Sequence, residues 1–254
     1  MKFDGKVVLV TGASSGIGEA LITRLAKENC KLVLIARRIE LLQQLSGKLN
    51  LTEDRHLIIK CDVGNKEDVA RAYELLRIKF GGVDVAILNA GYGHKVTVDT
   101  YDSQYAEKTF GANFFGIVYW VEQLLPQFAD KGTGIIAAVS SLADNRGYSG
   151  SGFYCASKAA ASTYLEGLRI ELKPRGVKVI TIKPGFVRTP MTDSNDFKMP
   201  LLMEPEKAAR IITEGIKKEK SVIQFPWQTV FLTRLVGMLP NSLYEWLAGK
   251  SKYK

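Results

Sequence analysis

The chain has 254 residues, of which 46% are hydrophobic and 24% charged, and its 35 Lys and Arg residues exceed its 26 Asp and Glu residues. This composition is too apolar for a disordered chain, and a chain of this length buries enough surface to fold without a disulfide or structural metal. The formal net charge of +9 invites a nucleic-acid partner, but no stretch interleaves basic and aromatic residues, so we predict no nucleic-acid binding and expect anionic small ligands instead.

Short apolar runs alternate with segments of helical periodicity over most of the chain. We predict strands at residues 6–10, 31–35, 56–60, 83–88, 134–139 and 177–182, and helices at residues 17–29, 40–49, 66–80, 103–128 and 153–172. The strand segments are continuously apolar, which is typical of a parallel sheet covered on both faces. The predicted fold class is therefore α/β, with a doubly wound parallel sheet and helices on both faces.

The last quarter of the chain departs from this alternation. Residues 189–202 lack a clear period, so we predict a loop with at most a short helix, followed by an amphipathic helix at 205–218 and a strand at 222–224. No linker or repeat interrupts the sequence. We therefore expect residues 1–254 to form a single domain, with 221–254 as its last strand and an apolar helical tail.

Apolar residues recur at helical spacing in this tail: Trp227, Val230, Phe231, Leu235 and Met238. Pro240 interrupts the pattern, and Ser242 with Glu245 fits a capping box for a second helix at 243–248. Basic residues lie along the segment or just after it: Arg234, Lys250, Lys252 and Lys254. Four roles remain open: ordinary packing on the core or a partner subunit, a lid over an apolar substrate, a subunit interface, and docking on an anionic bilayer surface.

Cysteine and histidine usage limits the metal chemistry. The three cysteines, Cys30, Cys61 and Cys155, are far apart, and the chain has only two histidines. A zinc site is therefore not expected, and three free thiols indicate a reducing compartment. The amino-terminal residues lead directly into a strand, and no apolar run reaches the length of a membrane span, so we expect a cytoplasmic protein without a targeting segment.

A glycine-rich turn follows the first predicted strand, with the sequence Thr11-Gly12-Ala13-Ser14-Ser15-Gly16-Ile17-Gly18. Glycines at such a turn let the backbone approach a phosphate closely, and the next helix directs its positive end toward the same point. The hydroxyls of Ser14 and Ser15 add hydrogen-bond donors. A tight connection without a ligand is the alternative, but the position between a strand and a helix favours a dinucleotide site.

The second predicted strand ends in Ile35-Ala36-Arg37-Arg38, where a dinucleotide fold meets the adenosine ribose. A carboxylate there would bind the 2′-hydroxyl of NAD, whereas arginine accommodates the 2′-phosphate of NADP. Positions 35–38 hold no Asp or Glu. A solvated basic pair is the alternative, but the planar fork of arginine suits phosphate well, so we predict a preference for NADP(H) over NAD(H).

Tyr154 and Lys158 lie four residues apart, which places both side chains on one face of the predicted helix. A tyrosine of ordinary pKa is a poor acid–base catalyst at neutral pH, and a neighbouring ammonium favours its phenolate form. The pair alone is a common pattern and carries little weight without other motifs.

Further motifs accompany the glycine-rich turn, Tyr154 and Lys158 in one order and at characteristic intervals. They are Asn89-Ala90-Gly91, Asn113, Ser141 and Pro184-Gly185. Together they resemble the short-chain dehydrogenase/reductase family over about residues 4–220. The resemblance implies a Rossmann-type fold with a seven-stranded parallel sheet. It also implies a reaction that moves hydride between NAD(P) and a carbonyl or alcohol.

The resemblance assigns four catalytic positions: Asn113, Ser141, Tyr154 and Lys158. It implies that Tyr154 is the general acid/base, that Lys158 activates it and grips the nicotinamide ribose, and that Asn113 supports a water-mediated proton relay. Ser141 rather than Ser140 would hold the substrate oxygen. The cofactor-binding positions implied are Gly12, Ser14, Ser15, Gly16, Ile17, Gly18, Arg37, Arg38, Asp62, Val63, Asn89, Ala90, Gly91, Tyr154, Lys158, Pro184, Gly185, Val187 and Thr189.

The expected function is NADP(H)-dependent interconversion of a carbonyl and an alcohol, on a bulky apolar ketone or alcohol if the tail forms part of the site. A catalytically silent nucleotide-binding regulatory protein of the same fold is the alternative. A nucleotide-sugar epimerase or dehydratase is a third, although its extra substrate lobe does not fit this chain length. The resemblance further implies a homodimer or homotetramer through the helices at about 103–128 and 153–172, with exposed faces carrying Phe114, Phe115, Tyr119, Tyr164 and Leu168.

Overall fold

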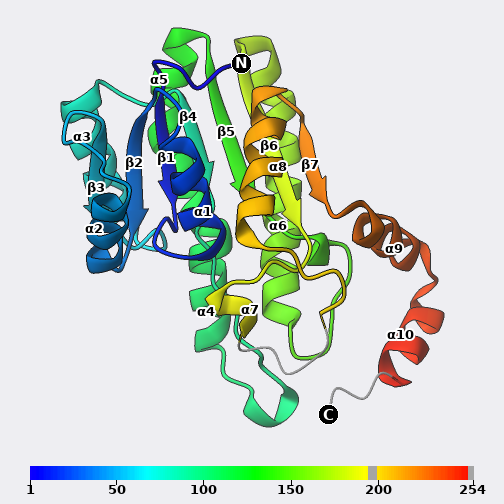
Figure 1. Ribbon diagram of the computed structural model, residues 1–254. Helices are drawn as coiled ribbons and strands as arrows, with labels where there is room; N and C mark the ends of the chain where they lie inside the picture. The colour runs from blue at the N-terminus through cyan, green and yellow to red at the C-terminus, as the bar shows by residue number, and fades with distance from the viewer. Residues whose placement is uncertain (194–198, 251–254) are drawn as a thin grey trace.

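The computed structural model describes residues 1–193 and 199–250, and its centre is a parallel sheet of seven strands (Figure 1). The strands lie in the order β3-β2-β1-β4-β5-β6-β7. Their bounds are Val7–Thr11 (β1), Lys31–Ala36 (β2), His56–Lys60 (β3), Val85–Leu88 (β4), Gly134–Val139 (β5), Val177–Pro184 (β6) and Val222–Phe225 (β7). All residues of β1, β4 and β5 are buried. The predicted fold class is confirmed.

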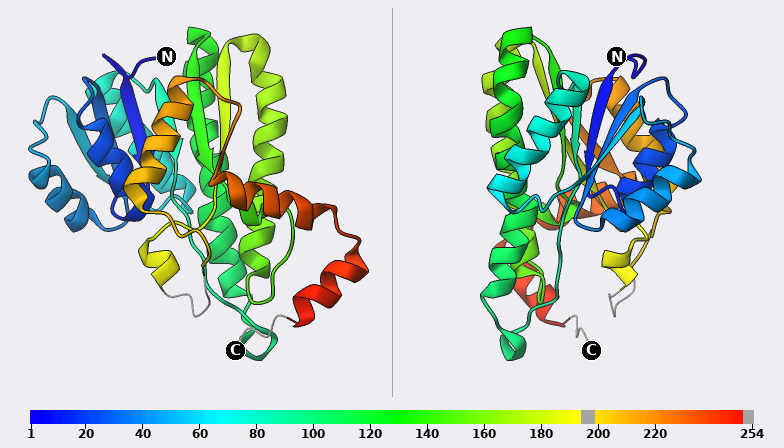
Figure 2. Two further views of the ribbon diagram at one scale, coloured as in Figure 1. Left: turned by 45° about the vertical axis from the view of Figure 1, so that its right-hand side comes forward. Right: turned by 90° about the vertical axis from the view of Figure 1, so that its left-hand side faces the viewer.

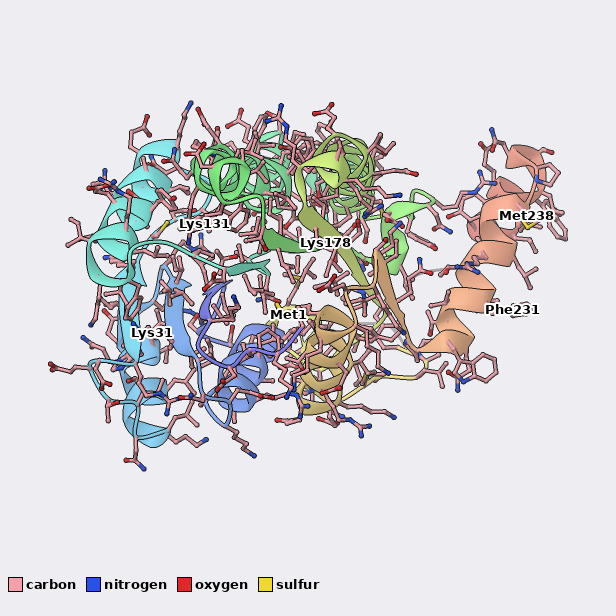
Figure 3. The ribbon with its side chains drawn as sticks, turned by 90° about the horizontal axis from the view of Figure 1, so that it is seen from above. Met1, Lys31, Lys131, Lys178, Phe231 and Met238 are labelled. Carbon is pink, nitrogen blue, oxygen red and sulfur yellow. The ribbon has the colours of Figure 1, made fainter. Side chains whose placement is uncertain are left out.

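Helices cover both faces of the sheet, as the view from above in Figure 3 and the turned views in Figure 2 show. One layer contains α1 (Gly16–Leu25), α2 (Ile39–Lys48) and α8 (Pro205–Lys217), and the other contains α3 (Lys66–Phe80), α5 (Gly116–Lys131) and α6 (Gly152–Leu172). Successive strand residues point to opposite faces. Accordingly, Val8 and Val10 pack in the first layer, whereas Leu9 packs in the second.

The helix predicted over residues 103–128 consists of three segments. Helix α4 (Gln104–Phe110) leads into a π-helical turn, Gly111–Phe115, and α5 follows. A π turn is rare and occurs mostly as a single turn within an α-helix, frequently at a functional site. This one carries Asn113, whose side chain is fully buried. Apolar periodicity does not reveal such a change of register, so the prediction gave one continuous helix.

Several shorter elements complete the body of the molecule. Helix α1 ends at Leu25 rather than Asn29, because tight backbone turns close after it, with Glu28 N–H donating to the Leu25 carbonyl. The predicted loop at 189–202 contains α7 (Pro190–Asp193), and its residues 194–198 lie outside the described ranges. Three 3-10 turns connect other elements: η1 (Val98–Thr100), η3 (Leu142–Asp144) and η4 (Lys173–Arg175).

The chain ends in two helices, α9 (Trp227–Met238) and α10 (Asn241–Lys250), which we call the helical tail. They stand to one side of the sheet (Figures 1 and 3). The predicted capping box is wrong, because α10 begins at Asn241 and Ser242 lies inside its first turn. Within the described ranges, no helix combines the length and hydrophobicity that crossing a bilayer requires.

Hydrogen bonds attach the helical tail to the loop after η3. The Asn145 side-chain amide donates to the Thr233 carbonyl at 2.6 Å, and Arg146 donates to the Gly237 carbonyl at 3.1 Å and to the Asn241 side chain at 2.8 Å. This loop lies between Ser141 and Tyr154 in the sequence. The tail is therefore joined to the segment that connects two of the predicted catalytic residues.

Candidate active site

A cleft of about 270 Å³ opens where strands of the sheet end at the carboxyl side, around the point where the strand order reverses between β1 and β4. Ligands of open α/β sheets bind at this kind of position. The cleft is lined by nearly all predicted site residues: Gly12, Ser14, Ser15, Gly16, Ile17, Arg37, Arg38, Asp62, Val63, Asn89, Ala90, Gly91, Ser141, Tyr154, Lys158, Pro184, Gly185, Val187 and Thr189. Gly18 and Asn113 are not among its lining residues.

The glycines of the turn after β1 are required by close packing. Gly12 and Gly16 have positive φ angles of 66° and 56°, a backbone conformation that favours glycine. A Cβ on Gly18 would lie 2.0 Å from the Gly12 carbonyl oxygen, so any side chain there would push α1 away from the turn. Gly18 thus shapes the cleft from behind, although it does not line it.

The side chains of Thr11 and Asn89 lock the ends of β1 and β4 together. The Thr11 hydroxyl accepts hydrogen bonds from the backbone N–H groups of Asn89 and Ala90, both at 3.0 Å. In return, the Asn89 amide donates to the carbonyls of Thr11 at 3.0 Å and Gly12 at 3.3 Å. These hydrogen bonds hold the glycine-rich turn against the floor of the cleft.

Cationic side chains gather at the end of β2. Arg38 donates to the hydroxyls of Ser14 at 3.2 Å and Ser15 at 3.0 Å, and a guanidinium nitrogen of Arg37 lies 3.8 Å from an Asp62 carboxylate oxygen. All three charged groups are solvent-accessible. The hydroxyls, the guanidinium of Arg38 and the amino end of α1 form a donor set that fits an anionic phosphate group.

Ser141, Tyr154 and Lys158 meet in the opposite half of the cleft. Ser141 caps the η3 turn, where its Oγ accepts from the Ala143 N–H at 3.1 Å, and its hydroxyl lowers the pKa of the neighbouring Tyr154. Lys158 is buried, with its Nζ donating to the Val139 carbonyl at 2.8 Å and lying 5.8 Å from the Tyr154 ring centroid.

The neighbouring serine is used differently. The Ser140 hydroxyl donates to the Lys158 carbonyl at 2.8 Å and lies near Ser162 and Asp144. Ser141 therefore has the hydroxyl that reaches Tyr154, and Ser140 holds helix α6 in place. The role of Ser141 in holding the substrate oxygen stays a prediction.

Burial dominates the ionisation of the two titratable groups. It raises the pKa of Tyr154 above its usual value, against the lowering effect of the Ser141 hydrogen bond, and it lowers the pKa of Lys158 to about 8. The sequence argument expected Lys158 to favour the phenolate, but in this geometry desolvation of the phenol outweighs that effect. The Tyr154 phenol thus keeps its proton beside a lysine whose pKa is about 8.

Asn113 is a buried support of the cleft. Its Oδ1 accepts from the Tyr92 N–H at 2.8 Å, and its Nδ2 donates to the Tyr92 carbonyl and to Ser157 Oγ, both at 2.9 Å. The π turn directs this side chain against the segment after β4. The proton-relay role of Asn113 stays a prediction.

The cleft includes residues that the sequence argument missed: Ala36, Cys61, Tyr92, Ala112, Val139, Ser140, Pro190, Met191 and Thr192. A Cβ on Gly93 would lie 3.3 Å from the Tyr154 ring and 3.4 Å from Met191 Sδ, so both side chains pack against Gly93. Several of these residues directly follow Gly91 or Thr189, and continuing each predicted strand end by a few residues would have found them.

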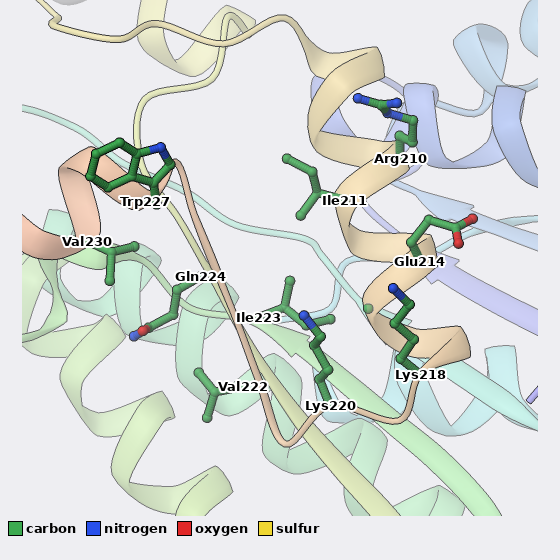
Figure 4. Close-up of a pocket in the computed structure, with 11 residues that line it drawn as sticks. Arg210, Ile211, Glu214, Lys218, Lys220, Val222, Ile223, Gln224, Trp227 and Val230 are labelled. Carbon is green, nitrogen blue, oxygen red and sulfur yellow. The ribbon is translucent and has the colours of Figure 1, made fainter.

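A second cavity of about 500 Å³ lies between α8 and β7 (Figure 4). Its mouth carries Arg210, Glu214, Lys218 and Lys220, and Trp227 closes one side. Glu214 is already paired with Arg24 at 2.9 Å. The cavity contains none of the predicted site residues, so its larger size does not make it the better candidate.

Comparisons with known proteins agree with this geometry. The sequence pattern described as short chain dehydrogenase matches residues 6–199. An uncharacterized oxidoreductase of Myxococcus xanthus is 34% identical over 240 residues, which cover 94% of this chain and 95% of that protein.

Two solved structures show the same fold. The 3-ketoacyl-(acyl-carrier-protein) reductase of Brucella melitensis, complexed with NADH, is 26% identical with a TM-score of 0.82 and covers 90% of this chain and 99% of that one. An alcohol dehydrogenase of Thermococcus sibiricus, complexed with 5-hydroxy-NADP, is 26% identical with a TM-score of 0.78 and covers 87% and 95%. The chain is therefore an oxidoreductase that belongs to the short-chain dehydrogenase family.

Proposed function

We propose that this chain interconverts a carbonyl and an alcohol with NADP(H) as the hydride carrier. The observation that carries the proposal is that one cleft brings together Ser141, Tyr154 and Lys158 with the glycine-rich turn. A bound nicotinamide nucleotide supplies or accepts the hydride, and the protein supplies position and proton transfer.

In the proposed mechanism the substrate oxygen takes a position between the hydroxyls of Ser141 and Tyr154. Both donate hydrogen bonds to that oxygen as negative charge develops on it during reduction. Tyr154 then transfers its proton to the oxygen. The raised pKa of the buried phenol keeps this proton in place until the oxygen becomes basic enough to take it.

Lys158 and Asn113 support this step. The Lys158 Nζ lies 5.8 Å from the Tyr154 ring centroid, Lys158 would hold the ribose of a bound nucleotide, and its pKa of about 8 allows it to exchange protons near neutral pH. Asn113 fixes Tyr92 and the backbone beyond Gly91, so that the floor of the cleft keeps its shape. The cofactor-binding residues named from the sequence are proposed in those roles, with Gly18 acting through packing.

The proposed preference for NADP(H) rests on the end of β2. Arg37 and Arg38 supply two guanidinium groups, and no carboxylate occupies positions 35–38. A 2′-phosphate would replace the hydroxyls of Ser14 and Ser15 as a stronger partner for Arg38. Asp62 lies 3.8 Å from Arg37, but with Arg38 present the net charge of these three side chains remains positive.

The proposed substrate is a bulky apolar ketone or alcohol. Met191 and Tyr92 bring apolar surface into the cleft beside Tyr154. The helical tail, joined to the loop between Ser141 and Tyr154, adds exposed apolar surface near the same wall.

The proposed assembly is a cytoplasmic homodimer or homotetramer, with residues 1–254 as one domain per subunit. Aromatic rings of α5, α6 and the π turn form a partly exposed group, in which Phe114 lies 5.3 Å from Phe115 and 5.9 Å from Tyr164. Leu168 was expected on this surface, and that expectation is wrong: it is 8% exposed, because it faces the sheet together with Leu165. Contact between the tail and an anionic membrane surface also stays a proposal.

An activity screen of purified protein tests the proposed function. NADPH oxidation is followed with a panel of ketones and aldehydes of increasing size, with Tyr154→Phe as the matched control. Turnover that depends on the Tyr154 hydroxyl supports the proposal. Tight NADPH binding without turnover of any carbonyl or alcohol would instead support the alternative, a nucleotide-binding regulatory protein.

A further inference from the structure

A charged pair lies behind the wall of the cleft that carries Ser141. Lys183 of β6 places its Nζ 2.7 Å from Asp144 Oδ2, and the two side chains are 21% and 7% exposed. Neither residue is among those that line the cleft. Asp144 ends the η3 turn, which begins immediately after Ser141.

The same carboxylate joins the turn to helix α6. The Ser162 hydroxyl donates to Asp144 Oδ2 and lies 2.8 Å from the Ser140 hydroxyl. Ser140 in turn donates to the Lys158 carbonyl at 2.8 Å. One carboxylate therefore connects β6, the turn that presents Ser141, and the helix that presents Tyr154 and Lys158.

We propose that Asp144 and Lys183 form a positioning pair, which holds Ser141 against Tyr154 and whose balanced charge sets the pH range in which the site works. The proposal rests on the carbonyl–alcohol chemistry proposed above. Removing one partner of a nearly buried ion pair leaves an unbalanced charge, whereas removing both does not. Neutralising Asp144 and neutralising Lys183 should consequently shift the pH–activity profile in opposite directions, and neutralising both should largely restore it.

The charges around Tyr154 and Lys158 determine the direction of each shift. The carboxylate of Asp144 raises the pKa of both Tyr154 and Lys158. The polar and titratable groups around these two residues come from five elements: Ser141 and Asp144 (η3 turn), Cys155 (α6), the Val139 carbonyl (β5), Asn113 (π turn) and Lys183 (β6). Asp144 and Lys183 are the ion pair within this set.

Loss of the Asp144 charge should therefore shift the pH–activity profile to lower pH. Loss of the Lys183 charge leaves the field of Asp144 uncompensated and should shift the profile to higher pH. A role that is only structural would damage both variants in the same way and would not separate them by direction.

The experiment compares Asp144→Asn, Lys183→Met and the double variant with the wild type. The matched control is Lys178→Met, which removes a cation from the same strand where it pairs with Glu219 at 3.6 Å on the surface. NADPH-dependent turnover of one carbonyl substrate is measured from about pH 6 to about pH 10, and unfolding by urea is followed in parallel.

We expect each single variant to lose about tenfold in kcat, with little change in the KM for NADPH, and the two profiles to move apart by about half a pH unit or more in total. The double variant should bring the profile back toward the wild type, and Lys178→Met should leave it unchanged. Shifts in the same direction, or no shift in variants that are destabilised, would overturn the proposal.

A second readout separates this proposal from the proposed function. The ionisation of Tyr154 is measured as the ultraviolet titration difference between each variant and the same variant carrying Tyr154→Phe. Opposite shifts of this titration support the positioning pair even if the wild type turns over none of the carbonyls, a result that would refute only the proposed function. Identical Tyr154 titrations in all variants would refute the positioning pair.

Discussion

Helices α8 and α9 are separated only by the short strand β7, yet they differ completely in burial. Helix α8 buries Ala208, Ala209, Ile212 and Ile216 against the sheet and α1. Helix α9 is the more apolar of the two, with Arg234 as its single charged residue, and none of its residues is buried. Its side chains at the two ends, Trp227 and Met238, are 74% and 81% exposed.

The difference shows that segregation, rather than apolar content, decides how a helix packs. In α8 the charged residues occupy one side and the apolar residues the other, so the sequence specifies which face turns to the core. In α9 apolar residues occur on every side. Such a helix is normally covered. In the described part of the chain, α9 instead makes hydrogen bonds to the loop at Asn145 and Arg146 and to Gln224 of β7, and none of its residues is buried. The body of the molecule buries its apolar helix faces, whereas the tail leaves apolar side chains exposed.

The largest contrast between body and tail should appear in catalysis. Tyr154→Phe keeps the ring and the fold but removes the proton donor, so we expect turnover to fall by about a thousandfold while NADPH still binds. Phe231→Ser in the tail, the comparison variant, should leave turnover of a small carbonyl unchanged. Steady-state kinetics and NADPH fluorescence titration measure both effects. Near-normal turnover by Tyr154→Phe would show that another group is the acid.

The second largest difference is expected in stability, because substitutions in α8 and α9 should change the free energy of unfolding by different amounts. Ile212 of α8 is fully buried, and Ile212→Ala should lower the free energy of unfolding by about 2–4 kcal/mol through lost burial and a cavity. Phe231 of α9 is 60% exposed, and Phe231→Ala should change it by less than about 1 kcal/mol. Urea denaturation at a fixed, low protein concentration measures both. An equal cost for the two variants would mean that the tail is covered in solution.

The sequence was sufficient for the body because each of its elements carries a local signal. The valine-rich run at β1, the glycine-rich turn after it and the pair Tyr154 and Lys158 each predict a structure or role that neighbouring elements reinforce. The π turn at Asn113 could not be predicted, because it changes the helical register by one residue within an otherwise regular apolar pattern. Leu168 was misplaced because helical spacing alone does not say which face of α6 meets the sheet.

Side-chain hydrogen-bond partners are a second kind of feature that sequence patterns do not predict. The hydrogen bonds from Arg38 to Ser14 and Ser15 join residues more than 20 positions apart, and the attachment of Arg146 to α9 joins residues more than 90 apart. Both depend on where the folded backbone brings two segments together. In the tail, the described fold leaves apolar side chains of α9 exposed, and the sequence pattern does not identify what contacts them.

A smaller effect is expected in nucleotide affinity, where Arg37 of the body is compared with Arg234 of the tail. Arg37→Asp places a carboxylate where the 2′-phosphate is proposed to bind and should weaken NADPH binding by about ten- to a hundredfold, while NADH binding stays the same or improves. Arg234→Asp makes the same charge change on α9 and should leave both affinities unaltered. Fluorescence titration with each nucleotide measures them. Equal or better use of NADH by the wild type would refute the proposed preference.

The smallest expected effect concerns the tail itself. Deleting the residues after Trp227 removes the exposed apolar helices together with their hydrogen bonds to Asn145 and Arg146. We expect the KM for bulky apolar ketones to rise about threefold and that for small ketones to stay constant, because no tail residue lines the cleft directly. Light scattering should also show a changed oligomer size, and cosedimentation with anionic vesicles should decrease if the tail binds them.

A point variant separates the two contributions of the tail. Phe231→Ser combined with Met238→Ser removes apolar surface at residues 60% and 81% exposed but keeps the hydrogen bonds of Arg146. If this variant reproduces the truncation, the apolar surface is responsible. If only the truncation changes KM, the attachment to the loop between Ser141 and Tyr154 is responsible. Unchanged assembly, vesicle binding and substrate profile in both would show that the tail is passive.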